Sequence, residues 1–254
     1  MSRVVLSAPT TFVEGDILTL DPGESHHVAR VLRRKTGDRI KVLDGRGNVG
    51  LAELKTCDSR ASEISLLRVH HHPRTLPQLM IGQAVPKGKS METILKMVTE
   101  LGASQIRPLS TVNGDIPQST FGSGKKLDKW RAISQEACKQ CENPWYPTLE
   151  VGSKLSDWVE ALPTNTLLIY GSLEDEAHSL VDTASRLRAH QSQGGAFALT
   201  IGPEGDFSAE EYALLRENSG IPIRLGTNIL RTETATPALL SALISHLDSG
   251  GSPS

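Results

Sequence analysis

The chain has 254 residues, of which 38% are hydrophobic and 22% are charged, a balance typical of a globular protein. It contains no apolar run of about 18 residues, so we expect no membrane-spanning helix, and its first residues lack the apolar core of a signal peptide. Its three cysteines do not indicate a disulfide framework, which favours a reducing compartment, and the net charge of −2 argues weakly against nucleic acid as a partner.

The first part of the chain has mostly the pattern of β-strands. Residues 39–43 and 49–54 alternate between apolar and polar side chains, and Asp44-Gly45 lies between them, which is a hairpin signal. Residues 61–69 form a third strand candidate. Residues 26–34 are the exception, because their apolar side chains recur at helical spacing.

Positive charge is concentrated in this first part. Residues 1–75 hold 12 Lys and Arg against 9 Asp and Glu, whereas residues 76–254 hold 15 against 20. A nucleic-acid partner should therefore meet the first part. An ordinary solvated surface would carry the same small excess.

Three adjacent histidines, His70, His71 and His72, raise the question of a metal site. Neighbouring residues on a strand point to opposite faces, so these side chains do not readily share one ion. No cysteine or carboxylate cluster lies near them in sequence, and we expect no metal.

A boundary between two domains is expected at residues 73–77, which contain two prolines after the β-rich segment. The next elements are a strand at 79–85, a helix at 90–100 capped by Ser90, and a strand at 105–109. This alternation predicts a parallel sheet.

Two short motifs in the middle of the chain do not carry the chemistry that their residues suggest. The glycine-rich stretch at 122–126 fails the spacing of a phosphate-binding loop, so we expect a flexible loop before a helix at 130–140. Cys138 and Cys141 have redox or zinc spacing, but they lie in a helical pattern without a second pair. An inert helix is therefore the favoured interpretation.

Two strand candidates in the C-terminal half each end in a loop with glycine. Residues 197–201 lead into Gly202-Pro203-Glu204-Gly205, and residues 221–225 lead into Gly226-Thr227-Asn228. Glycine allows backbone to approach a ligand closely, and ligands of open α/β sheets bind beyond the carboxyl ends of strands. We therefore expect a ligand pocket between these loops, although each glycine alone is equally consistent with an ordinary turn.

The remaining C-terminal elements are a strand at 166–170, a helix at 179–190 and a final helical segment at 229–247. Ser208 and Glu211 form a capping box, which predicts that a helix begins after the first glycine loop.

Four segments of the chain resemble the RsmE-type methyltransferases of the SPOUT superfamily, and they are IGPEGDF, LGTNILRTETA, HHVARVLRRKTGD and QAVPKGKSMETILKMVTELGASQIRPL. The resemblance implies methylation of uridine N3 in 16S-type small-subunit ribosomal RNA, with S-adenosylmethionine as the methyl donor. It also implies a PUA-like β-barrel that holds RNA at 1–75, an α/β methyltransferase domain with a trefoil knot at 76–248, and a homodimer. Residues 249–254 are expected to be a disordered tail.

The resemblance also implies a set of site residues. Arg231 is expected to orient the uracil or to stabilise its developing negative charge, and Glu204 and Glu233 are candidates for the base or for orienting the cofactor. Either carboxylate would equally serve a helix N-terminus. The residues expected to bind cofactor are Gly171, Ile201, Gly202, Pro203, Glu204, Gly205, Leu225, Gly226, Asn228, Ile229, Leu230 and Thr234. Those expected to bind RNA are His27, Arg30, Arg33, Arg34, Lys87 and Lys89, with ordinary solvated cations as the alternative.

The chain departs from the family pattern at three positions. Asn113 and Asn143 stand where the family usually has arginine, and Asp206 stands where it usually has glycine. Loss of two cations would weaken attraction to phosphate. A different RNA substrate, or RNA binding without catalysis, therefore remains an alternative. The resemblance places the protein in the cytoplasm, or in an organelle if a transit peptide has been removed.

Overall fold

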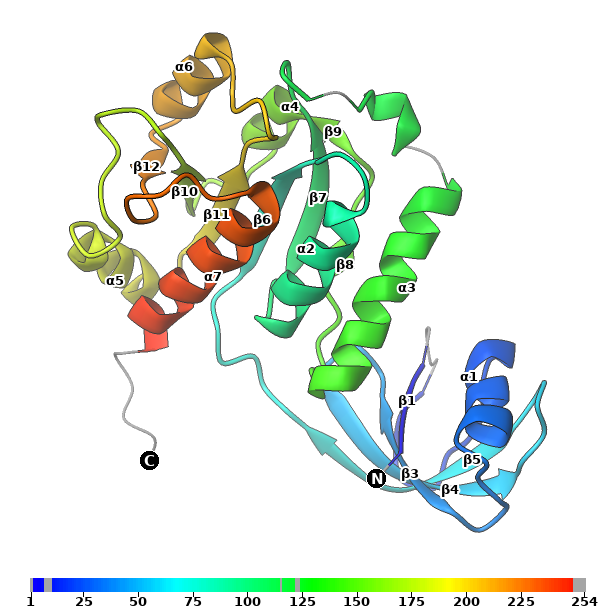
Figure 1. The fold of residues 1–254 in the computed structure, drawn as a ribbon. Helices are drawn as coiled ribbons and strands as arrows, with labels where there is room; N and C mark the ends of the chain where they lie inside the picture. Colours follow the sequence, from blue (N-terminus) through cyan, green and yellow to red (C-terminus); the bar gives the residue numbers. More distant parts are fainter. Residues whose placement is uncertain (1, 7–10, 115, 122–123, 249–254) are drawn as a thin grey trace. The chain divides into compact units, whose positions relative to one another are not determined.

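The chain folds as two compact units (Figure 1). The computed structural model describes residues 2–6, 11–114, 116–121 and 124–248. The first unit consists of Met1–Arg74 together with Gln135–Tyr146, and the second consists of Thr75–Ser134 and Pro147–Ser254. The sequence had led us to expect a second domain continuous from residue 76 to residue 248, whereas the structure assigns residues 135–146 to the first unit.

The first unit is built around a sheet with the strand order β1-β3-β4-β5-β2. Its strands are β1 (Arg3–Val5), β2 (Ile17–Thr19), β3 (Arg39–Leu43), β4 (Asn48–Thr56) and β5 (Glu63–His71). β3 and β4 pair antiparallel with Leu43 opposite Val49, which confirms the predicted hairpin at Asp44-Gly45. Alternate residues of the strands are buried in one apolar core, which includes Val4, Ile40, Ala52 and Ile64.

The helix predicted at 26–34 is only partly correct. Helix α1 (Pro22–His26) begins earlier, since the Asp21 side chain accepts a hydrogen bond from the Glu24 amide at 2.9 Å and a proline follows at the first helical position. A π-helical turn, His27–Val31, continues it, and Arg33 then adopts a left-handed conformation with φ 51°. Residues 33–34 therefore lie beyond the helix, which residue spacing alone did not indicate.

Aromatic side chains from residues 145 and 146 cover the β3–β4 turn. A Cβ atom on Gly45 would lie 2.2 Å from the Tyr146 ring, and one on Gly47 would lie 2.4 Å from the Trp145 ring. Both glycines also have positive φ, so a larger residue at either position would both clash with the ring and strain the backbone. This close approach explains why residues 135–146 belong to the first unit.

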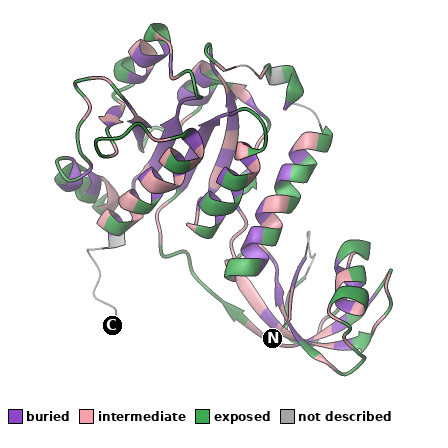
Figure 2. Cartoon of the chain, in the orientation of Figure 1, coloured by how far each residue is buried: buried purple, intermediate pink, exposed green. Residues whose placement is uncertain are grey.

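The second unit has a parallel sheet with the strand order β12-β10-β11-β6-β7-β8, and β9 also pairs with β7. Its strands are β6 (Leu79–Ala84), β7 (Gln105–Ser110), β8 (Thr148–Leu149), β9 (Ser153–Lys154), β10 (Thr166–Gly171), β11 (Ala196–Ile201) and β12 (Ile221–Ile223). The predicted parallel α/β arrangement is confirmed. Figure 2 shows the buried central strands of this sheet.

Helices cover both faces of this sheet. They are α2 (Ser90–Glu100), α3 (Gly124–Cys141), α4 (Leu155–Glu160), α5 (Ala184–Ser192), α6 (Ala209–Glu217) and α7 (Thr232–Asp248), and a 3-10 turn spans Gln118–Thr120. Side chains of α2, α5 and α7 share one apolar core with the sheet, whereas those of α4 and α6 share another. The predicted apolar face of α2, which includes Ile94 and Val98, is fully buried.

Several predicted boundaries need correction. Lys89 rather than Ser90 is the N-cap of α2, and it makes no side-chain capping bond. Gly124 already belongs to α3, while residues 122–123 and 249–254 lie outside the described residues. The predicted helices at 179–190 and 229–247 begin later, at Ala184 and Thr232. The capping box of Ser208 and Glu211 is confirmed in both of its hydrogen bonds.

Candidate active site

A cavity of the second unit lies where β10, β11 and β12 end. These strands are neighbours and run parallel, so their carboxyl ends meet at one edge of the sheet. The cavity has a volume of about 520 Å³, within the range of small-molecule sites. Its lining comes from the loops that follow the three strands and from the start of α7, at residues 171–173, 201–204, 206, 223–232 and 235.

Most residues that we expected to bind the cofactor line this cavity. They are Gly171, Ile201, Gly202, Pro203, Glu204, Leu225, Gly226, Asn228, Ile229 and Leu230. Gly205 and Thr234 do not belong to the lining. A Cβ atom on Gly205 would lie 3.1 Å from that of Asn113, and the Thr234 amide donates to the Arg231 carbonyl at 2.8 Å.

The candidate catalytic residues occupy different positions. Arg231 and Glu204 line the cavity, whereas Glu233 does not and lies in the first turn of α7. The Arg231 carbonyl accepts amide hydrogen bonds from Thr234 and Ala235, so its backbone begins α7. Its exposed guanidinium makes no hydrogen bond or ion pair with the residues that the structure describes, which leaves it available to a ligand.

Further residues line the cavity that we had not named as cofactor ligands, although Thr227, Thr232 and Ala235 lie within the LGTNILRTETA motif, and they are Ser172, Leu173, Ile223, Arg224, Thr227, Thr232 and Ala235. Sequence alone does not distinguish Arg224 from a solvated side chain, which an arginine directly after a strand usually is. Its Nη2 atom instead donates to the carbonyl oxygens of Leu173 at 2.5 Å and Glu174 at 2.9 Å.

A buried polar chain connects α7 to the strands beneath the cavity. The Thr232 hydroxyl donates to the Gly202 carbonyl at 3.2 Å. One turn later, the Thr236 hydroxyl donates to Gln83 Oε1 at 2.6 Å. Thr236 and Gln83 are both almost completely buried, so these bonds satisfy groups that water cannot reach. The start of α7 is thereby fixed to the carboxyl end of β11.

The loop after β11 is held by contacts on both of its sides. Glu204 Oε1 accepts a hydrogen bond from the Lys87 amide at 3.0 Å. The Asn113 side-chain amide donates to the carbonyls of Gly205 and Asp206, both at 3.1 Å. Asn113, one of the three departures from the family pattern, therefore stabilises this loop.

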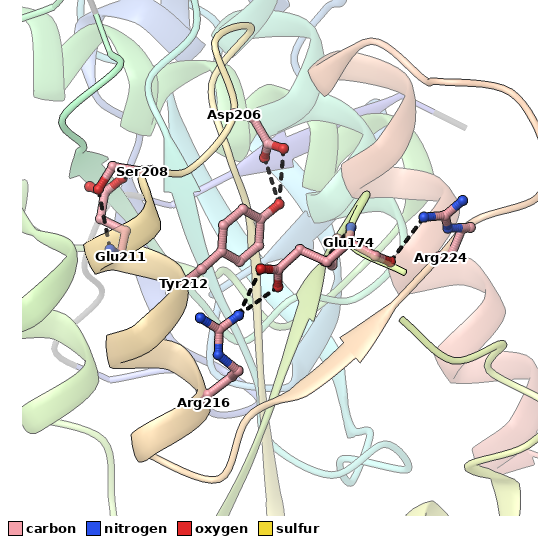
Figure 3. A network of polar contacts seen from close by, with 8 residues as sticks. Glu174, Asp206, Ser208, Glu211, Tyr212, Arg216 and Arg224 are labelled. Atoms are coloured by element: carbon pink, nitrogen blue, oxygen red, sulfur yellow. Dashed lines mark hydrogen bonds and ion pairs between the residues drawn. The ribbon is translucent and has the colours of Figure 1, made fainter. Parts of the chain in front are cut away.

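Asp206 has a backbone conformation that glycine adopts readily. Its φ is 60°, in the left-handed region that glycine, asparagine and aspartate tolerate best. Asp206 lines the cavity, and its carboxylate accepts hydrogen bonds from the Phe207 amide at 2.8 Å and the Tyr212 hydroxyl at 2.9 Å (Figure 3). Burial, together with the neighbouring carboxylate, raises the pKa of Tyr212, so its hydroxyl stays protonated and donates.

The residues expected to bind RNA are divided between the two units. In the first unit, Arg30 and Arg33 are exposed, whereas Arg34 Nε donates to Ser2 Oγ at 2.9 Å. Burial and the nearby Lys139 lower the pKa of His27, which favours its neutral form. Lys87 and Lys89 of the second unit are exposed, and the Lys87 amide makes the contact with Glu204. Asn143, the other departure, accepts a hydrogen bond from the Trp145 amide at 2.9 Å.

The histidine and cysteine motifs carry no visible ligand set. His71 Nδ1 lies 2.9 Å from Asn48 Oδ1, and the rings of His70 and His72 pack edge to face. Burial raises the pKa of the Cys138 thiol, which disfavours the reactive thiolate. Among the described residues, no three His, Cys, Asp or Glu side chains gather as they would around a metal ion. None of the helices in the same residues is both long and apolar enough to cross a membrane.

Comparison with known families finds matches across both units. Residues 73–244 match the RNA methyltransferase domain, and residues 20–66 match the RNA methyltransferase PUA domain. A Synechocystis protein named Ribosomal RNA small subunit methyltransferase E is 31% identical over 98% of this chain and 79% of its own length. The protein of the same name from Bacillus subtilis is 26% identical over 93% of this chain and 90% of its own length.

Solved structures show the same fold. A Legionella pneumophila protein described as a methyltransferase, solved with S-adenosylmethionine bound, is 28% identical with a TM-score of 0.84, and the match covers 96% of both chains. A Neisseria gonorrhoeae Ribosomal RNA small subunit methyltransferase E matches with a TM-score of 0.85 over 96% of this chain and 97% of its own. Because this protein is only 24% identical to the chain, the similarity between the two structures shows a shared fold.

Proposed function

Because the chain belongs to the RsmE-type family of RNA methyltransferases, we propose that it methylates N3 of a uridine in 16S-type small-subunit ribosomal RNA, using S-adenosylmethionine. The observation that carries this proposal is the cavity at the ends of β10, β11 and β12. Its walls come from the 201–204 and 223–232 segments, which also contain the motifs of the family. A relative that is 28% identical was solved with S-adenosylmethionine bound.

The cavity fits S-adenosylmethionine in size and in chemistry. Its volume of about 520 Å³ suits a ligand of this size. Glycines 171, 202 and 226 bring backbone N–H and C=O groups to the cavity wall, where they can pair with adenine and ribose edges. When bound, this cofactor supplies an activated methyl group, and its sulfonium becomes a neutral thioether on transfer. The proposed site needs no metal.

Arg231 is proposed as the residue that stabilises the reacting uracil. The uridine N3–H is a weak acid, so the base gains negative charge as its proton leaves. A cation placed beside the uracil would stabilise that charge, and the guanidinium of Arg231 is exposed at the cavity. Of the two candidate carboxylates, Glu204 lines the cavity and is proposed as the base or as an orienting group. Glu233 is proposed to stabilise the N-terminus of α7 instead.

The first unit is proposed to hold the RNA. Arg30, Arg33 and Arg34 present cations in a unit that matches an RNA methyltransferase PUA domain. Lys87 and Lys89 are proposed to contact phosphate beside the cavity. We also propose that the protein acts as a homodimer with a knotted cofactor site, in the compartment that contains its ribosomes.

A second candidate is a methyltransferase with another RNA substrate, and the side chain of Asn113 favours it. This residue contacts the loop after β11 with a neutral amide, so a phosphate there would meet no charge from this position. The two candidates differ in the nucleoside that they produce and in the RNA that contains it.

The test is methylation of small ribosomal subunits from cells that lack the gene, followed by mass spectrometry of nucleosides. Wild-type protein should produce 3-methyluridine in the small-subunit RNA. Arg231→Ala should reduce the rate by at least about 100-fold, as expected for loss of a charge-stabilising donor. Arg188→Ala, at an exposed position of α5, serves as the control and should retain wild-type activity. Methylation of another RNA or nucleoside would support the second candidate, and full activity of Arg231→Ala would remove its proposed role.

A further inference from the structure

We propose that Tyr212 and Arg216 of α6 are positioning residues, which hold two loops of the cavity in the shape that binds S-adenosylmethionine. The two loops are residues 172–174 after β10 and residues 202–207 after β11. This inference rests on the proposed function, because it assumes that this cofactor occupies the cavity. Among the cavity-lining residues that the structure describes, none comes from α6, so any effect must pass through the loops.

Tyr212 holds the loop after β11. Its hydroxyl lies 2.9 Å from both carboxylate oxygens of Asp206, and one of these oxygens also accepts the Phe207 amide at 2.8 Å. A hydrogen bond to a charged oxygen in a half-buried place is stronger than one between neutral groups. Asp206 is itself part of the cavity wall, so Tyr212 fixes a wall residue without touching the ligand.

Arg216 holds the loop after β10. Its Nη1 atom lies 2.7 and 2.8 Å from the two carboxylate oxygens of Glu174. Arg224, directly after β12, binds the same loop through the carbonyls of Leu173 and Glu174. Figure 3 shows Tyr212 and Arg216 side by side on α6, directed at Asp206 and Glu174 respectively.

The spacing of the two side chains makes α6 suitable for this role. Residues four apart lie on one face of a helix, so Tyr212 and Arg216 point in a common direction. The helix is itself firmly placed, because Leu215 is fully buried against the sheet. Glu211 completes the capping box and also accepts the Val112 amide at 2.9 Å. Both loops are therefore fastened to one rigid support.

The two contacts should differ in strength. Tyr212 is buried, and removal of its hydroxyl leaves the Asp206 carboxylate one donor short in the cavity wall. Tyr212→Phe should therefore weaken S-adenosylmethionine binding by about five- to tenfold. Arg216 is half exposed at its side chain, where water competes for the ion pair. Arg216→Gln should weaken binding by about two- to threefold.

The experiment is calorimetric titration of the full-length protein with S-adenosylmethionine, combined with steady-state methylation of small ribosomal subunits. Tyr146→Phe is a matched control, because the Tyr146 hydroxyl donates to the Leu43 carbonyl at 3.0 Å in the first unit. For the positioning role, KM for the cofactor should rise with Kd, while kcat at saturating cofactor stays within about twofold of wild type. Arg216→Lys should recover part of the affinity lost in Arg216→Gln.

The outcomes separate this inference from the proposed function. Weaker binding by Tyr212→Phe and Arg216→Gln, with unchanged binding by Tyr146→Phe, supports the inference. Unchanged affinity in both α6 variants, or a fall in kcat without a change in Kd, overturns it. If Tyr212→Phe does not fold, the result for the exposed Arg216→Gln decides. Absence of binding by folded wild-type protein contradicts the proposed function itself.

Discussion

Substitution of Gly202 by alanine tests how tightly the loop after β11 is built. A Cβ atom there would lie 3.2 Å from Asp206 Oδ1 and 3.2 Å from the Phe207 amide nitrogen. Ordinary contacts of a methyl group are longer, so the Asp206 carboxylate must move by a few tenths of an ångström. That oxygen accepts both the Phe207 amide and the Tyr212 hydroxyl, and displacement weakens both bonds.

The expected cost follows from those two hydrogen bonds. Bonds to a charged group contribute about 1.5–3 kcal/mol each, and a shift of this size should remove part of one or both. We therefore expect Gly202→Ala to cost about 1–2 kcal/mol in S-adenosylmethionine binding, which corresponds to about 5- to 30-fold weaker affinity. Calorimetric titration measures the affinity, and circular dichroism checks that the variant is folded.

Gly124→Ala provides the matched control for the added methyl group. At Gly124 the nearest atom to a new Cβ is Asp128 Oδ2 at 3.8 Å, an ordinary contact distance. Because alanine favours a helix more than glycine does, this control should be as stable as wild type or slightly more stable. If Gly202→Ala binds the cofactor as wild type does and melts at the same temperature, the loop relaxes freely and the reasoning is refuted.

Two further predictions concern stability. Thr236→Val leaves the buried Gln83 Oε1 without its donor, which should cost about 1–3 kcal/mol and lower the Tm by about 3–10 °C. Glu142 is hydrogen-bonded by Lys41 and Arg3, which hold its pKa below the usual value of 4.5. This bound carboxylate stabilises the fold above pH 4.5, and its contribution disappears as the pH falls through the lowered pKa. Glu142→Gln should therefore be less stable than wild type at pH 7, by up to about 1 kcal/mol after allowance for its exposure, and the difference should shrink as the pH falls below 4.5.

Thermal unfolding at several pH values checks both stability predictions. Thr234→Val, at an exposed position of the same helix, should change the Tm less than Thr236→Val does. An equal effect would mean that the Gln83 contact contributes nothing specific. A stability difference for Glu142→Gln that does not shrink as the pH falls well below 4.5 would show that charge is not its cause.

The elements that sequence predicted well depend on contacts between near neighbours in the chain. The hairpin at Asp44-Gly45 and the capping box of Ser208 and Glu211 need only residues within a few positions of each other. The apolar face of α2 follows from periodicity in the same way.

The features that sequence missed depend on residues far apart in the chain. Tyr146 packs on Gly45 across about 100 residues, so no local pattern could assign residues 135–146 to the first unit. The cavity likewise combines features that near neighbours determine with features that depend on residues far apart in the chain. The glycine loops were predicted from sequence, whereas the contacts of Arg224 with Leu173 and of Tyr212 with Asp206 required the folded sheet.

The first unit consists of two separate segments of the chain, and this affects how the protein folds during synthesis. After residue 74 has been made, about 70 further residues must follow before Trp145 and Tyr146 can cover the β3–β4 turn. At about 5–20 residues per second, this interval lasts about 4–14 s. In that time Glu24 also lacks Lys139, whose ammonium lies 2.9 Å from it in the finished fold. The N-terminal unit is therefore completed only while the ribosome is already making the second unit, which links the folding of the two units in time.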